Sequence, residues 1–253
     1  MYHLQLADID TEQATVVPLH AADAFQTPWH SFDHISIAPQ SEHCWGSGRQ
    51  QVEYGYLVLE GDLELRAGTC RSPAKAPAVL RTLDPKHSIA NTGTVTARVL
   101  AHRVRLVEAA PSASVDQFTA AAAVDPNLLQ WRPSIHGGVG RIATRHIWGP
   151  DDFASAWTFL DHAILAPGSS VGYHHHGGLE ESFIVLGGQG YVTIDESCFE
   201  VGTGSVTLQG IGQAHGIYNV ADEELSFIRV AVADTDGAFT TVDEHDDLTG
   251  RRP

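Results

Sequence analysis

One stretch in the second half of the chain decides the fold, Gly168-Ser-Ser-Val-Gly-Tyr-His174-His175-His176-Gly-Gly-Leu-Glu180-Glu181-Ser-Phe-Ile-Val-Leu-Gly-Gly188-Gln-Gly190. His174 and His176 are two positions apart, so in a β-strand their side chains point to the same face. Glu181 follows a Gly-Gly pair and begins an apolar run, residues 182–186, that is typical of the next strand. We therefore expect a hairpin-like return that brings the Glu181 carboxylate opposite the two imidazoles.

A second stretch adds a third histidine after a glycine-rich turn: Gly204-Ser-Val-Thr-Leu-Gln-Gly210-Ile-Gly212-Gln-Ala-His215-Gly-Ile-Tyr-Asn219. Three neutral imidazoles and one carboxylate form a nitrogen and oxygen donor set. Such a set suits a divalent transition metal of the Fe, Mn, Ni, Cu or Zn group better than Ca or Mg. The predicted metal ligands are His174, His176, Glu181 and His215.

The two stretches resemble the two motifs of the cupin superfamily. The first motif is matched at every position, by Gly168, His174, His176, Glu181 and Gly188. The second motif is matched by Gly204, Gly212, His215 and Asn219, but Gly210 stands where the family usually has Pro, a change that should loosen a turn without removing a ligand. The resemblance implies a small antiparallel β-barrel with one divalent transition metal inside (Fe, Mn, Ni or Zn). It implies no particular reaction, because one fold hosts many functions.

The order of elements in this region has a counterpart in the first half of the chain. Residues 54–61 parallel residues 181–188, and His87 with Asn91 parallels His215 with Asn219, at a period of about 130 residues. The sequence therefore predicts an all-β fold of two tandem cupin (double-stranded β-helix or jelly-roll) barrels, a bicupin. Residues 1–110 form the N-terminal cupin, residues 111–127 the linker, and residues 128–253 the C-terminal, metal-binding cupin.

The N-terminal copy has lost most of the expected ligands. Tyr54 stands where the carboxylate would be, and Ser47 and Arg49 stand where the paired histidines would be. His87 remains, with His43 and Cys44 nearby as weaker candidates, and one imidazole does not hold a metal at useful occupancy. We expect this barrel to be degenerate, metal-free and structural.

Flanking segments are predicted to be less regular than the barrels. The Ala-rich linker has room for one helical turn, and the acidic tail at residues 243–247 should be frayed. Residues 51–60 and 63–66, joined by Gly61-Asp62, are predicted to form a hairpin.

Composition excludes several classes of function. The chain has 15 Lys and Arg against 31 Asp and Glu, a formal net charge of −16, which disfavours nucleic acid and anionic membrane surfaces as partners. Cys44, Cys70 and Cys198 show neither a disulfide framework nor a zinc spacing. The first residues lack the features of a signal peptide, and no run of about 18 apolar residues predicts a membrane span. We expect a cytoplasmic protein.

Other residues near the motifs compete for roles in the site. His175 should point away from its two neighbours, and Glu180 could replace Glu181 as a ligand only in a slipped register. His136, His146 and His162 are candidates for acid–base work or for ordinary structural hydrogen bonds. Gln213, Tyr218 and Arg229 are further candidates to line the pocket.

The leading hypothesis is a metal-dependent cupin enzyme that acts on a small polar metabolite. Four protein ligands on a six-coordinate ion would leave two positions, enough for a hydroxy-acid, keto-acid or enediol group to chelate. The reaction could be an oxygenation (dioxygenase type), or a non-redox isomerase, cyclase or lyase step. The alternative is a non-catalytic small-molecule-binding or structural cupin. The two barrels are expected to pack as an internal pseudo-dimer, with room for a homodimer.

Overall fold

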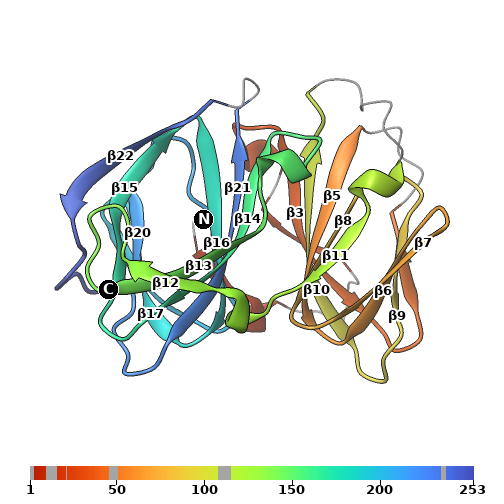
Figure 1. Cartoon of the computed structure of the whole chain (residues 1–253), viewed down its shortest axis with the longest axis horizontal. Helices are drawn as coiled ribbons and strands as arrows, with labels where there is room; N and C mark the ends of the chain where they lie inside the picture. The colour runs from red at the N-terminus through yellow and green to blue at the C-terminus, as the bar shows by residue number, and fades with distance from the viewer. Residues whose placement is uncertain (1–2, 10–15, 21, 46–50, 108–114, 235–237) are drawn as a thin grey trace. The chain divides into compact units, whose positions relative to one another are not determined.

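The structure is a computed structural model, and it describes residues 3–9, 16–20, 22–45, 51–107, 115–234 and 238–253. The predictions for Ser47 and Arg49 and for the first part of the linker fall outside these residues. The described residues form strands and short 3₁₀ helices, with no α-helix among them (Figure 1). This confirms the all-β fold class.

The chain divides into two compact units, each with two facing sheets. We name them the N-terminal barrel (Asp10–Asp125 and Pro150–Trp157) and the C-terminal barrel (Met1–Ile9, Pro126–Gly149 and Thr158–Pro253). Each unit therefore contains one short segment from the other half of the sequence. The boundaries predicted from the sequence, at residues 110 and 128, stay a prediction.

The C-terminal barrel contains a seven-stranded sheet in the order β1-β19-β16-β21-β14-β13-β12 and a five-stranded sheet in the order β18-β17-β20-β15-β22. The first sheet consists of β1 (His3–Gln5), β12 (Gln130–Pro133), β13 (Arg141–Trp148), β14 (Trp157–Leu165), β16 (Leu179–Gly187), β19 (Ser205–Thr207) and β21 (Leu225–Ala233). The second consists of β15 (Ser170–Gly177), β17 (Gln189–Ile194), β18 (Ser197–Gly202), β20 (His215–Tyr218) and β22 (Thr240–Asp246). Short 3₁₀ helices lie at Leu6–Asp8 and Pro126–Leu128, and Pro150–Asp152 forms another in the N-terminal barrel.

The N-terminal barrel has the same plan, with a six-stranded sheet in the order β11-β8-β5-β10-β3-β2 and a four-stranded sheet in the order β4-β9-β6-β7. Its strands are β2 (Val16–His20), β3 (Trp29–Ile37), β4 (Glu42–Cys44), β5 (Val52–Glu60), β6 (Asp62–Ala67), β7 (Cys70–Lys75), β8 (Ala78–Thr82), β9 (Ser88–Asn91), β10 (Ala97–Arg105) and β11 (Ala120–Ala123). Its other 3₁₀ helices are Ala22–Ala24 and Val115–Phe118.

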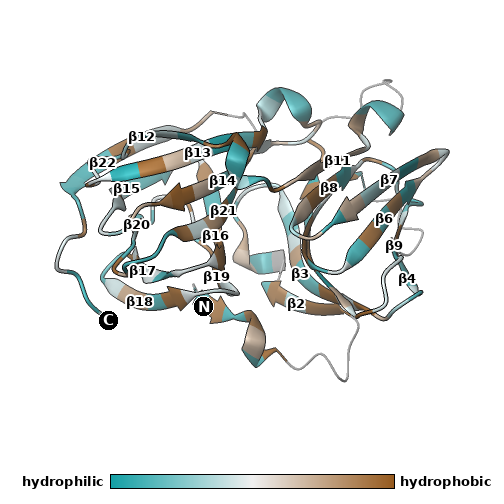
Figure 2. Cartoon of the chain, turned by 60° about the horizontal axis from the view of Figure 1, so that its bottom comes forward, coloured by the Kyte–Doolittle hydropathy of each residue, from teal (hydrophilic) through white to brown (hydrophobic). Residues whose placement is uncertain are grey.

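Alternating side chains fill the space between the two sheets of the C-terminal barrel. Ile142 of β13, Ala163 of β14, Phe183 of β16 and Phe227 of β21 belong to one fully buried cluster with residues of β15, β17 and β20. Figure 2 shows apolar and polar residues following one another along these strands. Because side chains alternate with period two, the odd-numbered residues of β14, β16 and β21 face the barrel interior.

The turns at residues 177–178 and 61–62 do not form hairpins, so both hairpin predictions were wrong. β15 ends at Gly177 and β16 begins at Leu179, but the two strands lie in different sheets of the C-terminal barrel. The same holds for β5 and β6 around Gly61. Both edges of β16 and of β5 are already paired with other strands, so the chain crosses to the facing sheet. Gly178 and Gly61 make this possible with φ of +84° and +93°, which disfavour a Cβ.

The predicted internal repeat is visible in hydrogen bonds. In the C-terminal barrel, the Asn219 side-chain amide donates to the carbonyls of Leu165 and Glu223 at 3.0 and 2.7 Å. In the N-terminal barrel, Asn91 donates to the carbonyls of Ile37 and Val95 at 2.9 and 2.7 Å. Each asparagine thus ties a turn to the end of a corresponding strand, β14 or β3.

The tail and the linker are more regular than predicted. Thr240–Asp246 is not frayed: it forms β22, which pairs with β15 along the histidine motif. In the linker, the 3₁₀ turn at Val115–Phe118 is followed by β11, which adds to the edge of β8, and a second 3₁₀ turn begins at Pro126. Both segments satisfy an open sheet edge, a gain that local charge and alanine content do not reveal. Among the described residues, no helix is both long and apolar enough to cross a membrane.

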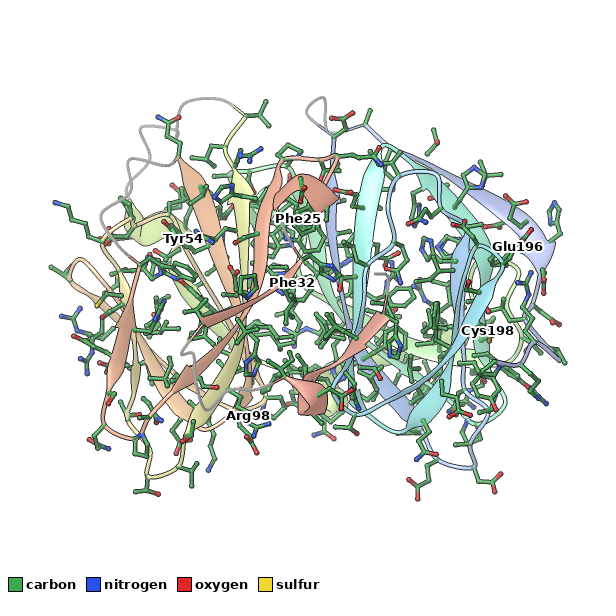
Figure 3. The ribbon with its side chains drawn as sticks, turned by 180° about the vertical axis from the view of Figure 1, so that it is seen from behind. Phe25, Phe32, Tyr54, Arg98, Glu196 and Cys198 are labelled. Carbon is green, nitrogen blue, oxygen red and sulfur yellow. The ribbon has the colours of Figure 1, made fainter. Side chains whose placement is uncertain are left out.

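An unusual histidine is buried in the N-terminal barrel on the face of β10 opposite to the interior cluster that holds Val99 and Ala101. His102 is 1% exposed, and its ring centroid lies 4.1 Å from that of Phe32, 5.6 Å from Trp29 and 5.8 Å from Trp157. Figure 3 labels Phe32. Neither ring nitrogen of His102 has a hydrogen-bond partner among the described residues. Burial, with a smaller effect of His20, lowers the pKa of His102 to about 3.

His102→Phe is expected to make the protein less sensitive to mild acid. The unfolded chain binds a proton at His102 below pH about 6.5, whereas the folded chain does not until pH about 3, so folding loses stability as pH falls through this window. The loss approaches about 1.4 kcal/mol per pH unit, and phenylalanine abolishes it. At neutral pH, the substitution removes two buried nitrogens without partners, which is stabilising, and adds volume, which is destabilising. The two effects should nearly cancel in the free energy of unfolding. Urea unfolding at pH 7.5 and 5.0 measures the difference; parallel pH dependences would contradict it.

Candidate metal centre

The structure brings the four predicted ligands together in the interior of the C-terminal barrel. His174, His176, Glu181 and His215 are all buried, and one potential ligand atom from each lies within 4.8 Å of the other three. The three histidines come from β15 and β20, which pair with His174 opposite His215. Glu181 comes from β16 of the facing sheet, so the carboxylate meets the imidazoles across the barrel interior.

Hydrogen bonds outside the cluster orient the three rings. Nδ1 of His174 donates to the carbonyl of Gly172 at 2.8 Å, and Nδ1 of His215 donates to the carbonyl of Gln213 at 2.9 Å. Nδ1 of His176 lies 2.9 Å from the hydroxyl of Thr241 on β22. Carbonyl acceptors place the proton of His174 and His215 on Nδ1, which leaves the Nε2 lone pair free.

Electrostatics keeps the donor atoms in the form that binds a cation. Burial, helped by the nearby rings of His215 and His136, lowers the pKa of His174 to about 2, so this imidazole is neutral at physiological pH. Burial alone would raise the pKa of Glu181, but the Arg229 guanidinium and the rings of His176 and His215 hold it well below its usual range. Nε of Arg229 donates to Oε1 of Glu181 at 2.8 Å.

The donor set fits a divalent transition metal. Nε2 of His215 lies 3.1 Å, and Nε2 of His176 lies 3.5 Å, from the same Oε2 of Glu181. With the His215 proton on Nδ1, a lone pair faces a carboxylate oxygen, which is favourable only with a cation between them. Nε2 of His176 has no hydrogen bond among the described residues. Nitrogen ligands about 2.1 Å from one ion lie at most about 4.2 Å apart, so slight contraction suffices.

The structure separates the competing candidates for these roles. Glu180 is buried but lies outside the cluster, as the alternation along β16 predicts. His175 faces away and lies 2.7 Å from Glu244 through Nδ1. Gln213 bonds within its own turn: its side chain accepts from the backbone N–H of Gly210 at 2.9 Å, a donor that proline would lack. Tyr218 alternates with the buried Ile217 and so faces away from the interior.

The three approach histidines have three different environments. His136 stacks on His174 with ring centroids 4.0 Å apart and lies 3.1 Å from Asp243. His146, on β13, is in hydrogen-bond contact with Asp161 of β14. His162 lies on the opposite face of β14 from Asp161 and bonds the Ser226 hydroxyl at 3.0 Å. Only His136 touches the cluster directly among these described contacts.

Sequence reasoning missed Thr241, Asp161 and Phe239. The ring of Phe239 lies 6.0 Å from that of His176 and is 40% exposed. A signal existed for Asp161, because a charge within the apolar run of residues 157–165 needs a partner when buried. No local signal marks Thr241, which reaches His176 from 65 residues away.

The corresponding interior of the N-terminal barrel holds an aromatic network. Tyr54, at the position of Glu181, packs against His87 with ring centroids 4.5 Å apart (Figure 3). The Tyr56 hydroxyl is in hydrogen-bond contact with Nε2 of His87, the atom that would face a metal. Burial lowers the pKa of His87 to about 4. That this barrel binds no metal stays a prediction.

Comparisons with known proteins agree with the fold. The sequence model of the family described as "Cupin domain" matches residues 161–231. The "Oxalate-binding protein" of Thermotoga maritima is 27% identical over 99 residues, which are 39% of this chain and 82% of that protein.

Solved structures resemble the chain over most of its length. A cupin 2 conserved barrel domain protein from Leptotrichia buccalis superposes with a TM-score of 0.64, covering 91% of this chain and 95% of that chain at 14% identity. An oxalate decarboxylase from Bacillus subtilis superposes with a TM-score of 0.61, covering 96% of this chain and 78% of that chain at 12% identity. At these identities the likeness shows the fold alone. Together with the family match over residues 161–231 and the buried cluster, it shows a chain of two cupin barrels, of which the C-terminal one carries the match to the cupin family.

Proposed function

We propose that the C-terminal barrel is the active site of a metal-dependent enzyme acting on a small, anionic, polar metabolite. The observation that carries the proposal is the oriented cluster itself, His174, His176, Glu181 and His215, buried and with its nitrogen lone pairs directed at one point. Without a cation, such a cluster adds no stability to the barrel, because well-packed apolar side chains at the same positions would be more stable.

An anionic substrate follows from the charges around the cluster. The ligands carry one negative charge, which the buried Arg229 already balances, so a divalent ion leaves the site strongly positive. The T. maritima relative is named for binding oxalate, a small dicarboxylate, which supports the same class of ligand. A bound ion would supply Lewis acidity and, if redox-active, electrons.

The chain's own residues would bind, orient and exclude water. The Arg229 guanidinium fixes the Glu181 carboxylate, and its Cζ lies 4.9 Å from the ring centroid of Phe159. Phe183 packs edge-on to His215, with ring centroids 5.8 Å apart. These rings keep the cluster in a region of low polarity, where electrostatic interactions with a bound anion are stronger than in water.

Metal analysis of untagged protein tests the proposal and divides its branches. We expect about one ion per chain, lost in the His174→Ala/His176→Ala variant. Iron would direct the search to oxygen consumption with small acids, whereas zinc, manganese or nickel would favour an isomerase, cyclase or lyase. The absence of metal from both proteins, even after reconstitution, would refute the enzyme proposal.

A second candidate is a non-catalytic binding protein, favoured by the name of the T. maritima relative. It predicts the same metal and the same affinity for small acids, but no turnover of any of them. Product analysis after prolonged incubation with a panel of small acids separates the two candidates. The homodimer and the cytoplasmic location stay predictions.

A further inference from the structure

A pocket of about 260 Å³ opens on the wall of the C-terminal barrel formed by β12, β13 and β14. Among the residues that line it are Gln130, Arg132, Thr144, Arg145, His146 and Asp161. Ile142 belongs to the interior core, and Thr144 and His146 follow it at the same period along β13, but the His146 side chain is 67% exposed. Gln130 pairs with Thr144, and Arg132 with Ile142, which places β12 side chains on that face as well.

The pocket adjoins the metal cluster through Arg229 and Phe159. The ring of Phe159 lies 4.9 Å from Cζ of Arg229 and 6.3 Å from the centroid of the His146 ring. Arg229 in turn holds Glu181 of the cluster. Arg229 and Phe159 thus lie between the cluster and the pocket, so a substrate bound at both would have to reach past these two side chains.

The pocket is cationic in a chain with a formal net charge of −16. Arg132 and Arg145 have no ion-pair partner among the described residues. Asp161, the one carboxylate among the described lining residues, is 4% exposed and contacts Nδ1 of His146, so Nε2 of this largely exposed ring remains available to a ligand. Arginine side chains without an anionic partner, and an imidazolium with one N–H to spare, are groups that bind carboxylates.

We propose that this pocket binds a second carboxylate of the substrate, with Arg132 and His146 as the binding residues, so that the substrate is a small dicarboxylate. The inference rests on the proposed function, because the other end of the same molecule chelates at the metal centre. Asp161 acts as a positioning residue that fixes the His146 ring.

The charge of His146 makes the preference for a dicarboxylate depend on pH. The hydrogen bond that His146 donates to Asp161 raises the pKa of His146 against the opposing effects of burial, Arg229 and Arg132. Asp161, Arg229 and Arg132, the charged groups that face His146, lie on β14, β21 and β12. The preference should therefore be strong at low pH and weaken as pH rises through the pKa of His146.

The test uses α-hydroxy acids in matched pairs that differ only at the far end, such as malate and 2-hydroxybutyrate, with one to three methylenes between the two ends. Titration calorimetry on the metal-loaded protein gives each affinity. We expect at least one dicarboxylate to bind about tenfold or more tightly than its methyl counterpart, a difference typical of one charge-assisted contact. The advantage should disappear in Arg132→Gln and shrink in His146→Gln, while the monoacids bind unchanged.

Arg141→Gln is the matched control, because Arg141 lies on β13 but stacks on Trp131 at 4.9 Å and does not line the pocket. If the dicarboxylate and its methyl counterpart bind with equal affinity in every pair, this inference is wrong, but the proposed metal site is unaffected. A preference that survives both Arg132→Gln and His146→Gln would also overturn the inference. If no acid binds the metal-loaded protein, the proposed function fails together with the inference.

Discussion

His176→Ala is expected to weaken metal binding by more than about a hundredfold. The ring supplies one of four buried donors, and Nε2 of His176 has no other partner among the described residues. Loss of an outer hydrogen-bond partner already costs about 10–100-fold in affinity, so loss of the ligand itself must exceed that range. Competition with a fluorescent chelator measures the dissociation constant directly, without any assumption about the reaction.

Thr241→Val separates the ligand from the residue that orients it. The Thr241 hydroxyl lies 2.9 Å from Nδ1 of His176, and valine keeps the shape of the side chain while removing that contact. We expect about 10–100-fold weaker metal binding, between wild type and His176→Ala. Thr240→Val, on the same strand, is the control and should bind metal as wild type does. Equal affinities of the two valine variants would show that β22 does not orient the site.

The ligand set was predictable because each member is fixed by a local rule. The two-residue spacing puts His174 and His176 on one face of β15 whichever strand pairs with it. The register from Gly188 favours Glu181 over Glu180, and the structure places Glu181 in the cluster. The turn glycines also limit where His215 can lie. The repeat was predictable for the same reason, since Asn91 and Asn219 make matching turn contacts.

Partners brought together by sheet pairing were not predictable. A Gly-Gly turn is compatible with a hairpin or with a crossing between sheets, and only the occupied edges of β16 decide for the crossing. The acidic strand β22 forms because β15 has an open edge, which its own composition does not show. Arg229 could be named as a candidate, but its contact with Glu181 depends on the register of β16 with β21.

Arg229→Met is expected to destabilise the metal-free C-terminal barrel by about 3–5 kcal/mol at pH 7. Glu181 is 1% exposed and the Arg229 side chain 11% exposed, so this ion pair is almost fully removed from water. Removing one partner of such a pair leaves an uncompensated buried charge, which costs about that much. Methionine is apolar and similar in length, so packing against Phe159 is largely retained. Urea unfolding of protein stripped of metal measures the change.

The control is an exposed pair with the same chemistry in the N-terminal barrel. Nε of Arg98 lies 3.2 Å from Glu60, with both side chains about half exposed, and Figure 3 shows Arg98 at the rim. Arg98→Met should cost less than about 1 kcal/mol, because water screens such pairs.

A double variant tests the cause of the loss. If the cost of Arg229→Met comes from the unpaired carboxylate, Glu181→Gln in the same protein should recover most of it, since a neutral amide is much easier to bury. Metal should also recover part of it, because Glu181 then regains a cationic partner. If Arg229→Met and the double variant are equally unstable with and without metal, Arg229 stabilises the barrel by packing on Phe159 and not by pairing with Glu181. Recovery by both routes would establish Glu181 as the charge around which this interior is built.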